Sequence, residues 1–533
     1  MKWNKTITLL MAGTMAISTM TGCGAKENLT ETTQTSAVSQ SPGTNEESGE
    51  GEKIVDLEVW NTNIGFLEVK KDGPLYNLYK DMFGVGIIQP YVEWNGGTTY
   101  QEQLNLKIAA GEMPDMFLPV NGMEVDLAKN GALLDLTDIL PEKAPHLWES
   151  IPQESWDVIR SYDPSGEGRI YMIPTVIDYP LMCGLIRQDW LDKLGLSIPE
   201  TQEEFVEVLR AFKNQDPNGN GQTDEVPTGG RQEARWMDHL FAMYGIAIWE
   251  GYPQWDVYDG EMTYAGVTPN MKDALLFIRG LYEEGLIDAE TLLNDKAGWE
   301  GKINSDRVGV YYHWAQSSYE YATTMFNSIG VKPEWVVLPP VSAAGYKGFY
   351  TEKKVKGIQW VIKNTTDQEK IDACMKVLDA YGNPDLREQF FLGVVGEHSA
   401  MVDGKLKRLP DDKKTMENLV FQPGNDISTV ESIVALLESV KSEDIAWAFD
   451  QSIANVKSMP QYGKIIAGDG IPNSVYDGYP DIMNRTLYVE YASKIITGEY
   501  PIDKFDEFVD KWYASGGEAV TRAAQEWYAK TQN

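Results

Sequence analysis

The sequence contains few of the residues on which metal sites and covalent catalysis depend. There are only 3 Cys and 4 His among 533 residues, and the His, at positions 146, 239, 313 and 398, show no paired metal-ligand spacing. No Ser-His-Asp, zinc or glycine-rich phosphate motif is present. We interpret Cys183 and Cys374 as small buried apolar residues. A disulfide between them is the alternative. The sequence therefore gives no motif for a metalloenzyme or a nucleophilic hydrolase.

Basic residues are also scarce. The 46 Lys and Arg stand against 80 Asp and Glu, which gives a formal net charge of −34 at pH 7. Such a surface repels phosphate backbones, so we expect no nucleic-acid partner. The overall field also disfavours an anionic ligand, although a local basic patch would override it.

Long apolar runs are missing after the N-terminus. Lys2 and Lys5 precede an uncharged, mostly apolar stretch, residues 6–19, which is shorter than the roughly 20 residues that a membrane-spanning helix needs. A basic start, a short apolar stretch and small residues define a secretory signal. Residues 20–23 resemble the lipobox of bacterial lipoproteins. The resemblance implies a signal peptide over residues 1–22 and a lipidated Cys23, and an ordinary signal with an incidental cysteine is the alternative.

The segment after Cys23 has the composition of a tether. Residues 24–52 are rich in Ser, Thr, Glu, Gly, Gln and Asn, and contain only Leu29 and Val38 as aliphatic side chains larger than Ala. Such a segment buries too little apolar surface to offset its conformational entropy, which predicts disorder. A flexible chain of this length reaches roughly 30 Å. Residues 23–52 therefore predict a body held at the extracytoplasmic face of the bacterial cell membrane through its lipid anchor only.

The body, residues 53–533, is longer than one ordinary hydrophobic core and predicts at least two lobes. Apolar stretches of strand length alternate with helical periods, which indicates an α/β fold. The expected strands are residues 54–60, 91–94, 115–118, 170–173, 308–314, 335–338 and 358–362.

The clearest expected helix begins at Thr201, which forms a capping box with Glu204 and is followed by apolar residues at helical spacing. A second helix is expected over residues 270–284, with Gly285 as its end. Two more are expected near the C-terminus, over residues 505–512 and 520–527.

The sharpest local motif, residues 216–225, matches the spacing of a calcium-binding EF-hand loop. Oxygen-bearing side chains stand at loop positions 1, 3, 5 and 9, a glycine at position 6 permits the tight turn, and position 7 offers a backbone carbonyl. The expected ligands are Asp216, Asn218, Asn220, Gln222, Asp224 and Glu225.

The loop departs from the EF-hand pattern at position 12. Pro227 replaces the usual bidentate Glu, so Glu225 at position 10 is the expected substitute. Val226 and Pro227 also prevent a normal exiting helix. We therefore predict a structural Ca²⁺ site rather than a sensor, and an Asn/Gly-rich turn without an ion is the alternative.

Short segments in a fixed order resemble one family, the extracellular solute-binding proteins of carbohydrate ATP-binding-cassette (ABC) importers. The similarity is to the long lipoprotein branch that includes alginate- and oligosaccharide-binding members. The calcium loop stands where the alginate-binding relatives carry theirs. The segments that carry the resemblance are residues 106–115, 130–136, 168–174, 187–196, 393–398, 495–499 and 505–517.

The resemblance implies a two-lobed, type II periplasmic-binding-protein-like α/β fold, with the lobes joined by hinge crossings and a ligand cleft between them. Residues 53–175 plus 343–395 are the expected first lobe, and residues 176–342 plus 396–533 the second, with the calcium loop. The implied function is to capture a carbohydrate, an oligosaccharide by preference, through lobe closure and to deliver it to membrane permease subunits. We expect a monomer and no enzymatic activity.

Candidate sugar-binding residues follow from position, because ligands of doubly wound sheets lie beyond the carboxyl ends of strands. Sugars combine flat C–H faces with hydroxyl groups, so aromatic rings, amides and carboxylates are the expected partners. The candidates after expected strands are Trp60, Asn61, Asn63, Trp94, Asn95, Tyr100, Asn121, Trp314 and Gln316. Each has simple packing as its alternative.

Four further candidates come from other segments. Trp236 and Trp255 lie in a polar, aromatic stretch of the second lobe. Glu397 and His398 lie at the family's second crossing, near the hinge. A lone His is more often a structural group, so that pair has a structural alternative.

Two rival functions remain at this level. A surface-anchored glycoside hydrolase needs two carboxylates, but with 80 acidic residues such pairs arise by chance and identify nothing. A binder of a non-sugar solute such as a peptide is the second rival. Turnover of a glycan would favour the first rival, and binding of peptides alone would favour the second.

Overall fold

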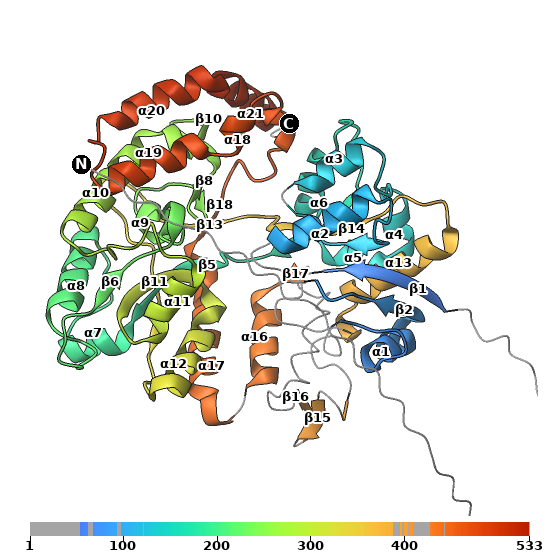
Figure 1. The fold of residues 1–533 in the computed structure, drawn as a ribbon, viewed down its shortest axis with the longest axis horizontal. Coiled ribbons are helices and arrows are strands. Elements are labelled where there is room, and N and C mark those ends of the chain that lie inside the picture. Colours follow the sequence, from blue (N-terminus) through green and yellow to red (C-terminus); the bar gives the residue numbers. More distant parts are fainter. Residues whose placement is uncertain are drawn as a thin grey trace, which may run out of the picture. The chain divides into compact units, whose positions relative to one another are not determined.

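The computed structural model describes residues 54–61, 68–92, 98–120, 122–386, 395–396, 399–402, 404–408, 427–441 and 443–531. These residues form a mixed α/β fold with two main sheets, each covered by helices (Figure 1). Among the described helices, none has both the length and the apolarity needed to cross a membrane.

The first sheet has six strands in the order β17-β4-β14-β3-β1-β2. β1 pairs in parallel with β2 and β3, whereas β14 runs antiparallel between β3 and β4. β17 adds to β4 in parallel. The bounds are β1 Val55–Trp60, β2 Val85–Ile88, β3 Met116–Phe117, β4 Met172–Ile177, β14 Gly357–Ile362 and β17 Ile427–Ser428.

Seven helices of the described chain accompany this sheet, and their apolar faces close one core. That core draws on residues 57–176 and 355–381, including the fully buried Trp156 and Trp360. The helices are α1 Pro74–Phe83, α2 Thr98–Ala109, α3 Met123–Lys129, α4 Ile139–Lys143, α5 Pro145–Ser150, α6 Gln153–Ser161 and α13 Gln368–Gly382.

The second sheet has four strands in the order β12-β5-β11-β6. β5 runs antiparallel to both neighbours, and its register pairs Met182 with Trp314 at one end and Arg187 with Trp335 at the other. β6 runs parallel to β11. The bounds are β5 Met182–Arg187, β6 Val226–Thr228, β11 Val308–Trp314 and β12 Trp335–Leu338.

Alternate residues of β12 enter two different apolar clusters, as the two-residue period of a strand requires. Trp335 and Val337 join one cluster, and Leu338 joins the other. The helices around them are α7 Gln188–Leu194, α8 Gln202–Asn214, α9 Asp238–Ala242, α10 Pro269–Glu283, α11 Lys296–Asn304, α12 Ser318–Ile329, α16 Val430–Val440, α17 Ala446–Ser458, α18 Pro480–Met483, α19 Thr486–Ile496, α20 Lys504–Trp512 and α21 Glu518–Thr531. Figure 1 shows α19 and α20, in red, side by side above α10.

Short two-stranded sheets complete the described elements. One of them, β13 with β18, lies where the chain leaves the second core for the first sheet. The pairs are β7 Ile248–Trp249 with β8 Tyr252–Pro253, β9 Trp255–Tyr258 with β10 Glu261–Tyr264, β13 Tyr350–Glu352 with β18 Gly463–Ile465, and β15 Ser399–Val402 with β16 Lys405–Arg408.

The chain passes between the two sets of elements at least three times. It does so from β4 to β5, from β13 to β14, and from β17 to α16. Two of these connections differ from the sequence-based partition. β17 pairs with the first sheet although it lies in the range expected for the second lobe, and Tyr350 belongs to the second set of cores although it lies in the range expected for the first.

Most expected elements are present. β11 and β12 match the expected strands, and Thr201 forms the predicted capping box with Glu204. The strand expected over residues 91–94 is wrong for its first half, since residues 91–92 are not a strand and the neighbouring strand is β2. Gly84 ends α1 in the left-handed conformation, so pairing starts directly at Val85. Cys183 and Cys374 are buried and free, as interpreted from the sequence.

Candidate functional site

An aromatic strip lies at the carboxyl end of β11. We define it by five residues in order of contact, Arg231, Trp236, His313, Trp314 and Lys356. The Arg231 guanidinium lies 5.6 Å from the Trp236 ring, whose centroid lies 4.8 Å from that of His313 in a stacked arrangement. The His313 and Trp314 rings are 5.5 Å apart, and the Lys356 ammonium lies 4.8 Å from the Trp314 ring. Two cations therefore bracket three rings.

Three separate segments bring this strip together. β11 places His313 and Trp314 at its end, and the loop after β6 carries Arg231 and Trp236. Lys356 comes from the connection between β13 and β14. The strip thus depends on the tertiary fold and lies beside one of the passages between the two sheets.

The backbone around Trp236 is strained. Trp236, Glu233 and Ala234 have φ values of 63°, 65° and 59°, in a region that non-glycine residues rarely occupy. Each such residue costs on the order of 1–3 kcal/mol, and strain of this kind persists where the surroundings enforce it, often at functional sites. Trp236 is held by stacking on His313 and by close packing with Trp299, 6.1 Å away.

The electrostatics of the strip favour a neutral imidazole between two cations. Burial, with smaller contributions from Lys296 and Arg231, lowers the pKa of His313 to about 3. Its Nδ1 lies 2.7 Å from the hydroxyl of Ser317. Burial also lowers the pKa of Arg231.

The strip offers more hydrogen-bond donors than it uses. The indole nitrogens of Trp236 and Trp314 are buried and have no acceptor in the described part of the chain. Buried hydrogen-bond donors are normally paired. An unpaired one either lowers the stability of the fold or serves to bind a group from outside the protein. Trp236 belongs to a buried cluster and is 6% exposed, whereas Trp314 is half-buried and is the indole of the strip that an occupant could contact.

Gln316, also predicted from the sequence, follows the strip in a 3-10 turn, Ala315–Ser317. Its Oε1 accepts a hydrogen bond from Tyr179 at 3.1 Å, and its backbone carbonyl accepts one from Ser452 at 2.5 Å. The side chain is half-buried. Gln316 thus ties the end of β11 to α17 and to the connection after β4.

On the first sheet, Trp60 and Asn61 end β1 and are buried. The Trp60 indole donates to Glu58 at 2.8 Å, and Lys107 lies 5.6 Å from its ring. Tyr100 is fully buried, and its hydroxyl donates to the carbonyls of Trp60 and Leu118. Tyr100 therefore supports the ends of β1 and β3 and has no surface available to a solute in this conformation.

Trp255 lies in the second core, away from the strip. Its indole donates to the hydroxyl of Tyr476 at 2.7 Å, and its ring packs against Tyr264 and Trp512. This environment is that of a packing residue. Six other sugar-binding candidates lie outside the described residues, as does Cys23, the predicted lipidation site: Asn63, Trp94, Asn95, Asn121, Glu397 and His398.

The calcium loop follows α8 and leads directly into β6, so no helix leaves it, as Val226 and Pro227 predict. Asp216 accepts hydrogen bonds from the backbone of Gly219, Asn220 and Gly221 at 2.9–3.1 Å. The remaining side chains join the same turn: Asn218 Oδ1 accepts from the Asn220 backbone, Asn220 Oδ1 accepts from that of Gln222, and Asn220 Nδ2 donates to Asp224.

Glu225 provides the test of whether this loop suits a cation. Both of its carboxylate oxygens are buried and have no hydrogen-bond partner in the described chain. Burial raises the pKa of Glu225, and the nearby carboxylates of Asp216 and Asp224 raise it further. A cation would relieve this repulsion, so the donor set fits calcium. Among the described residues, no group of three or more Asp, Glu, His or Cys side chains is arranged to hold a metal ion.

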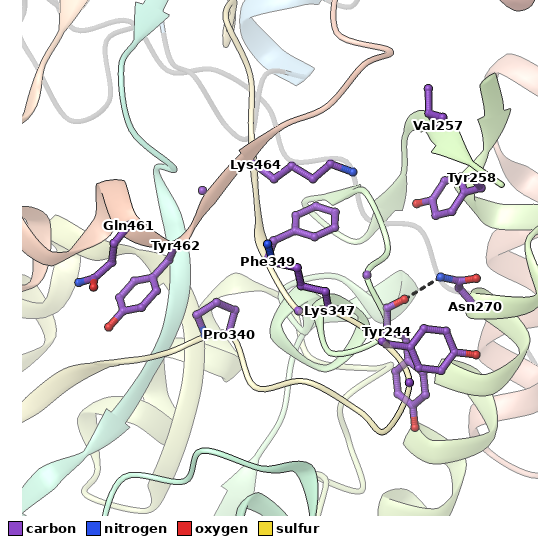
Figure 2. A pocket seen from close by; sticks show the side chains of 15 residues that line it. Tyr244, Val257, Tyr258, Asn270, Pro340, Lys347, Phe349, Gln461, Tyr462 and Lys464 are labelled. Carbon is purple, nitrogen blue, oxygen red and sulfur yellow. Dashed lines mark hydrogen bonds between the residues drawn. The ribbon is translucent and has the colours of Figure 1, made fainter. Parts of the chain in front are cut away.

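A separate pocket of about 610 Å³ is lined by the loop after α9, the start of α10 and the loop after β12 (Figure 2). Figure 2 shows Tyr244, Tyr258 and Phe349 around it, with Asn270 donating to the Tyr244 carbonyl at 2.8 Å. The Tyr258 hydroxyl accepts from the Ala247 backbone, and Lys464 pairs with Asp256. Much of its polar lining is therefore already engaged by the protein, unlike that of the aromatic strip.

Sequence reasoning identified Trp236 and Trp314 but missed the other members of the strip. His313 directly precedes Trp314, so the alternation of β11 could have raised it as a candidate. Arg231 lies in the same polar stretch as Trp236. Lys356 has no local signal, since only the fold brings the connection before β14 next to β11.

Comparison with known families assigns the class. Residues 89–385, more than half of the chain, match the family of bacterial extracellular solute-binding proteins. The chain belongs to this family.

Similar individual proteins agree with this class. The chain is 24% identical over 476 residues to FusA of Streptococcus pneumoniae serotype 4, a fructooligosaccharide ABC transporter substrate-binding protein, covering 83% of this chain and 86% of FusA. It is 23% identical over 458 residues to lipoprotein LipO of Bacillus subtilis, with the same shares covered.

Solved structures show the same fold. FusA in complex with kestose superposes with a TM-score of 0.66 at 21% identity, over 90% of this chain and 99% of FusA. The alginate-binding protein AlgQ2 without calcium ion gives 0.65 at 20% identity, over 90% and 98%. An EF-hand mutant of FusA with fructo-nystose also gives 0.65 at 20% identity, over 90% and 99%. The fold is therefore the two-lobed α/β fold of solute-binding proteins.

Proposed function

We propose that this protein is the substrate-binding component of an ABC importer for oligosaccharides. The observation that carries this proposal is the aromatic strip, in which Trp236 and Trp314 stand beside polar donors at the carboxyl end of β11 in a chain of the solute-binding family. FusA, whose described ligands are oligosaccharides, supports the carbohydrate class. We infer that the protein binds its ligand without turnover.

Closure of two lobes is the proposed mechanism. The first lobe would comprise the six-stranded sheet with its core, and the second would comprise the four-stranded sheet with its two clusters. A ligand that contacts both lobes only when they are closed shifts the population toward the closed form. A difference of about 5.5 kcal/mol between the two forms would carry the protein from mostly open to mostly closed. The permease would then recognise the closed form.

The proposed location is the outer face of the bacterial cell membrane. The basic start, the short apolar stretch and Cys23 support a lipid anchor, and the similarity to LipO, a lipoprotein, is consistent with it. We propose a monomer whose partners are the permease subunits and the carbohydrate.

A panel titration tests the function. Tryptophan fluorescence is measured while oligosaccharides, neutral and acidic, and a peptide pool are added separately. We expect saturable quenching by oligosaccharides, with no cleaved product detected by chromatography. Quenching by peptides alone would contradict the carbohydrate class, and release of product would favour a glycoside hydrolase.

Replacing Trp314 with alanine is expected to weaken binding of the best saccharide at least tenfold, because an aromatic platform in a binding site is worth about 1–3 kcal/mol. Isothermal titration calorimetry measures this change. Trp447→Ala is the matched control, since Trp447 also carries a lysine, Lys332, at 5.5 Å but belongs to α17. Equal losses in both variants would contradict a binding role for Trp314.

We also propose that the loop 216–225 binds calcium. Asp216, Asn218, Asn220, Asp224 and Glu225 would hold the ion through side-chain oxygens, and Gln222 through its carbonyl. The ion supplies positive charge to an acidic loop. The existence of an EF-hand mutant of FusA and of a calcium-free form of the alginate-binding protein AlgQ2 supports this assignment.

Calcium removal is expected to lower thermal stability, because an ion bound only by the native state stabilises it, by about 2.7 kcal/mol at a concentration 100 times its Kd. Differential scanning calorimetry in excess calcium and in excess chelator measures the shift. Glu225→Gln should abolish most of the shift, whereas Glu207→Gln, on the exposed face of α8, should keep it. An unchanged melting temperature of the wild type in chelator would rule out the ion site.

A further inference from the structure

The two cations of the aromatic strip have no carboxylate partner. In the part of the chain that the structure describes, Arg231 and Lys356 form no ion pair within 4.0 Å and instead lie against the Trp236 and Trp314 rings. Acidic residues outnumber basic ones by 80 to 46, so an unpaired cation is unexpected in this chain. Two of them occur at opposite ends of one strip.

The acidic groups nearest to these cations are occupied elsewhere. Glu250, which faces both Arg231 and Lys356, is bound by Arg235 at 2.9 Å. Glu300, which also faces Arg231, accepts a hydrogen bond from the Tyr321 hydroxyl at 3.2 Å and lies 3.7 Å from Lys296. The protein itself thus supplies no direct counter-charge to either end of the strip.

The strip also offers hydrogen-bond donors rather than acceptors, which favours a negatively charged occupant in the same way as its two cations. Arg231 and Lys356 are donors only. The indole N–H groups of Trp236 and Trp314 are buried donors without an acceptor among the described residues. An occupant that complements this surface must be rich in acceptors and negatively charged, and must present a flat apolar face to the Trp314 ring.

A sugar ring that carries a carboxylate has all three properties. Its C–H face stacks on an indole ring, its ring and hydroxyl oxygens accept hydrogen bonds, and its carboxylate accepts both N–H groups of a guanidinium at once. Successive separations of 4.8–5.6 Å along the strip give each cation its own neighbouring ring. Because the two unpaired cations lie at opposite ends of the strip, the arrangement matches a ligand with separated carboxylates better than a single anion.

We infer that the strip selects an acidic oligosaccharide, in which Arg231 and Lys356 each pair with a carboxylate while the half-buried Trp314 ring stacks on a sugar face and Trp236 supports Arg231 from below. This inference rests on the proposed function and names its ligand class. The net charge of −34 repels such a ligand at long range, so recognition depends on this local patch and on short-range contacts.

The two cations differ in the way in which each can hold a carboxylate. Arg231 presents a planar fork that suits one fixed carboxylate, whereas Lys356 presents a flexible point charge from the connection before β14. Lys356 is exposed in this conformation and Arg231 is half-buried. Arg231 is therefore the residue that fixes the orientation of the ligand, and Lys356 the one that follows movement of the connection.

The test compares acidic oligosaccharides with their own neutral forms. Trisaccharides of galacturonate, glucuronate, mannuronate and guluronate, and the methyl ester of each, are titrated by calorimetry into the full-length protein, with neutral trisaccharides alongside. We expect at least one acid to bind at least tenfold more tightly than its ester, and its affinity to fall as salt increases. Esterification removes only the charge, so it isolates the contribution of the carboxylates.

Matched variants identify the residues responsible. Arg231→Gln and Lys356→Gln should each lower the affinity for the acid at least tenfold and change that for the ester less than twofold. Lys332→Gln should change neither, because it removes a similar lysine–tryptophan contact near the opposite end of the second sheet. Thermal melting of each variant shows that it is folded.

The outcomes separate the two proposals. If neutral saccharides or the esters bind as tightly as the acids, the charge inference is wrong and the proposed function stands. If only peptides bind, or no saccharide binds, both are wrong. If an acid binds selectively but the Arg231 and Lys356 variants keep its affinity, selection occurs elsewhere and the strip is not its site.

Discussion

Replacing Arg187 with alanine is expected to destabilise the protein by about 3–5 kcal/mol, since its removal leaves the largely buried Asp306 carboxylate uncompensated. The Arg187 side chain is only 1% exposed. Its guanidinium donates to both oxygens of Asp189 and to Asp306 at 2.5–2.7 Å, and lies between the Trp190 and Trp335 rings. The substitution would remove two ion pairs and two ring contacts and would leave a cavity.

Urea unfolding followed by circular dichroism measures this effect through the midpoint and slope of the transition. Arg210→Ala is the matched control, because Arg210 also pairs with two carboxylates, Glu207 and Glu284, but its side chain is 43% exposed. Exposed pairs are worth about 0–1 kcal/mol, so this variant should remain close to wild type. Similar losses in both variants would show that burial does not set the value of these ion pairs.

Replacing Gly382 with alanine is expected to destabilise the first core by about 1–3 kcal/mol, the usual cost of overpacking. Gly382 ends α13, where α5 crosses it. A Cβ atom at this position would lie 2.2 Å from the Leu147 backbone nitrogen and 2.5 Å from the His146 carbonyl carbon. Backbone atoms cannot rotate away as a side chain can, so the two helices would have to separate.

Gly280→Ala provides the control with the opposite sign. Gly280 lies within α10, and a Cβ atom there would meet no atom within 4 Å. Alanine should stabilise that helix by about 0.5–1 kcal/mol, because glycine loses more backbone entropy on folding. Thermal unfolding of both variants measures the two effects. A loss of stability in Gly280→Ala, or none in Gly382→Ala, would contradict the packing described at these positions.

Local sequence patterns predicted those elements whose apolar residues have one clear period. β11 and β12 are buried strands bounded by polar residues, and the helix after Thr201 has both a capping box and an apolar stripe. The strand expected over residues 91–94 was misplaced because the real strand, β2, starts immediately after the end of α1, and four apolar or glycine residues there gave no period to detect.

The site was predictable only in part, and for a physical reason. Trp236 and Trp314 stood out as aromatics near strand ends, but so did Trp255 and Tyr100. The structure buries Trp236, Trp255 and Tyr100 in cores and leaves Trp314 half-buried. Whether an aromatic ring faces a core or a strip depends on contacts between distant segments. Lys356 shows the limit clearly, because nothing in its neighbourhood along the chain links it to Trp314.

The position of β14 has a consequence for how the chain reaches its native state. β14 lies between β3 and β4, yet it follows them by more than 170 residues and after the whole second sheet. Until β14 has been delivered, β3 and β4 have no strand to join them, and their pairing edges stay open to other chains. Contacts between residues so far apart in the sequence form slowly. Until the last third of the chain is available, the open edges of β3 and β4 would therefore need protection from pairing with other chains.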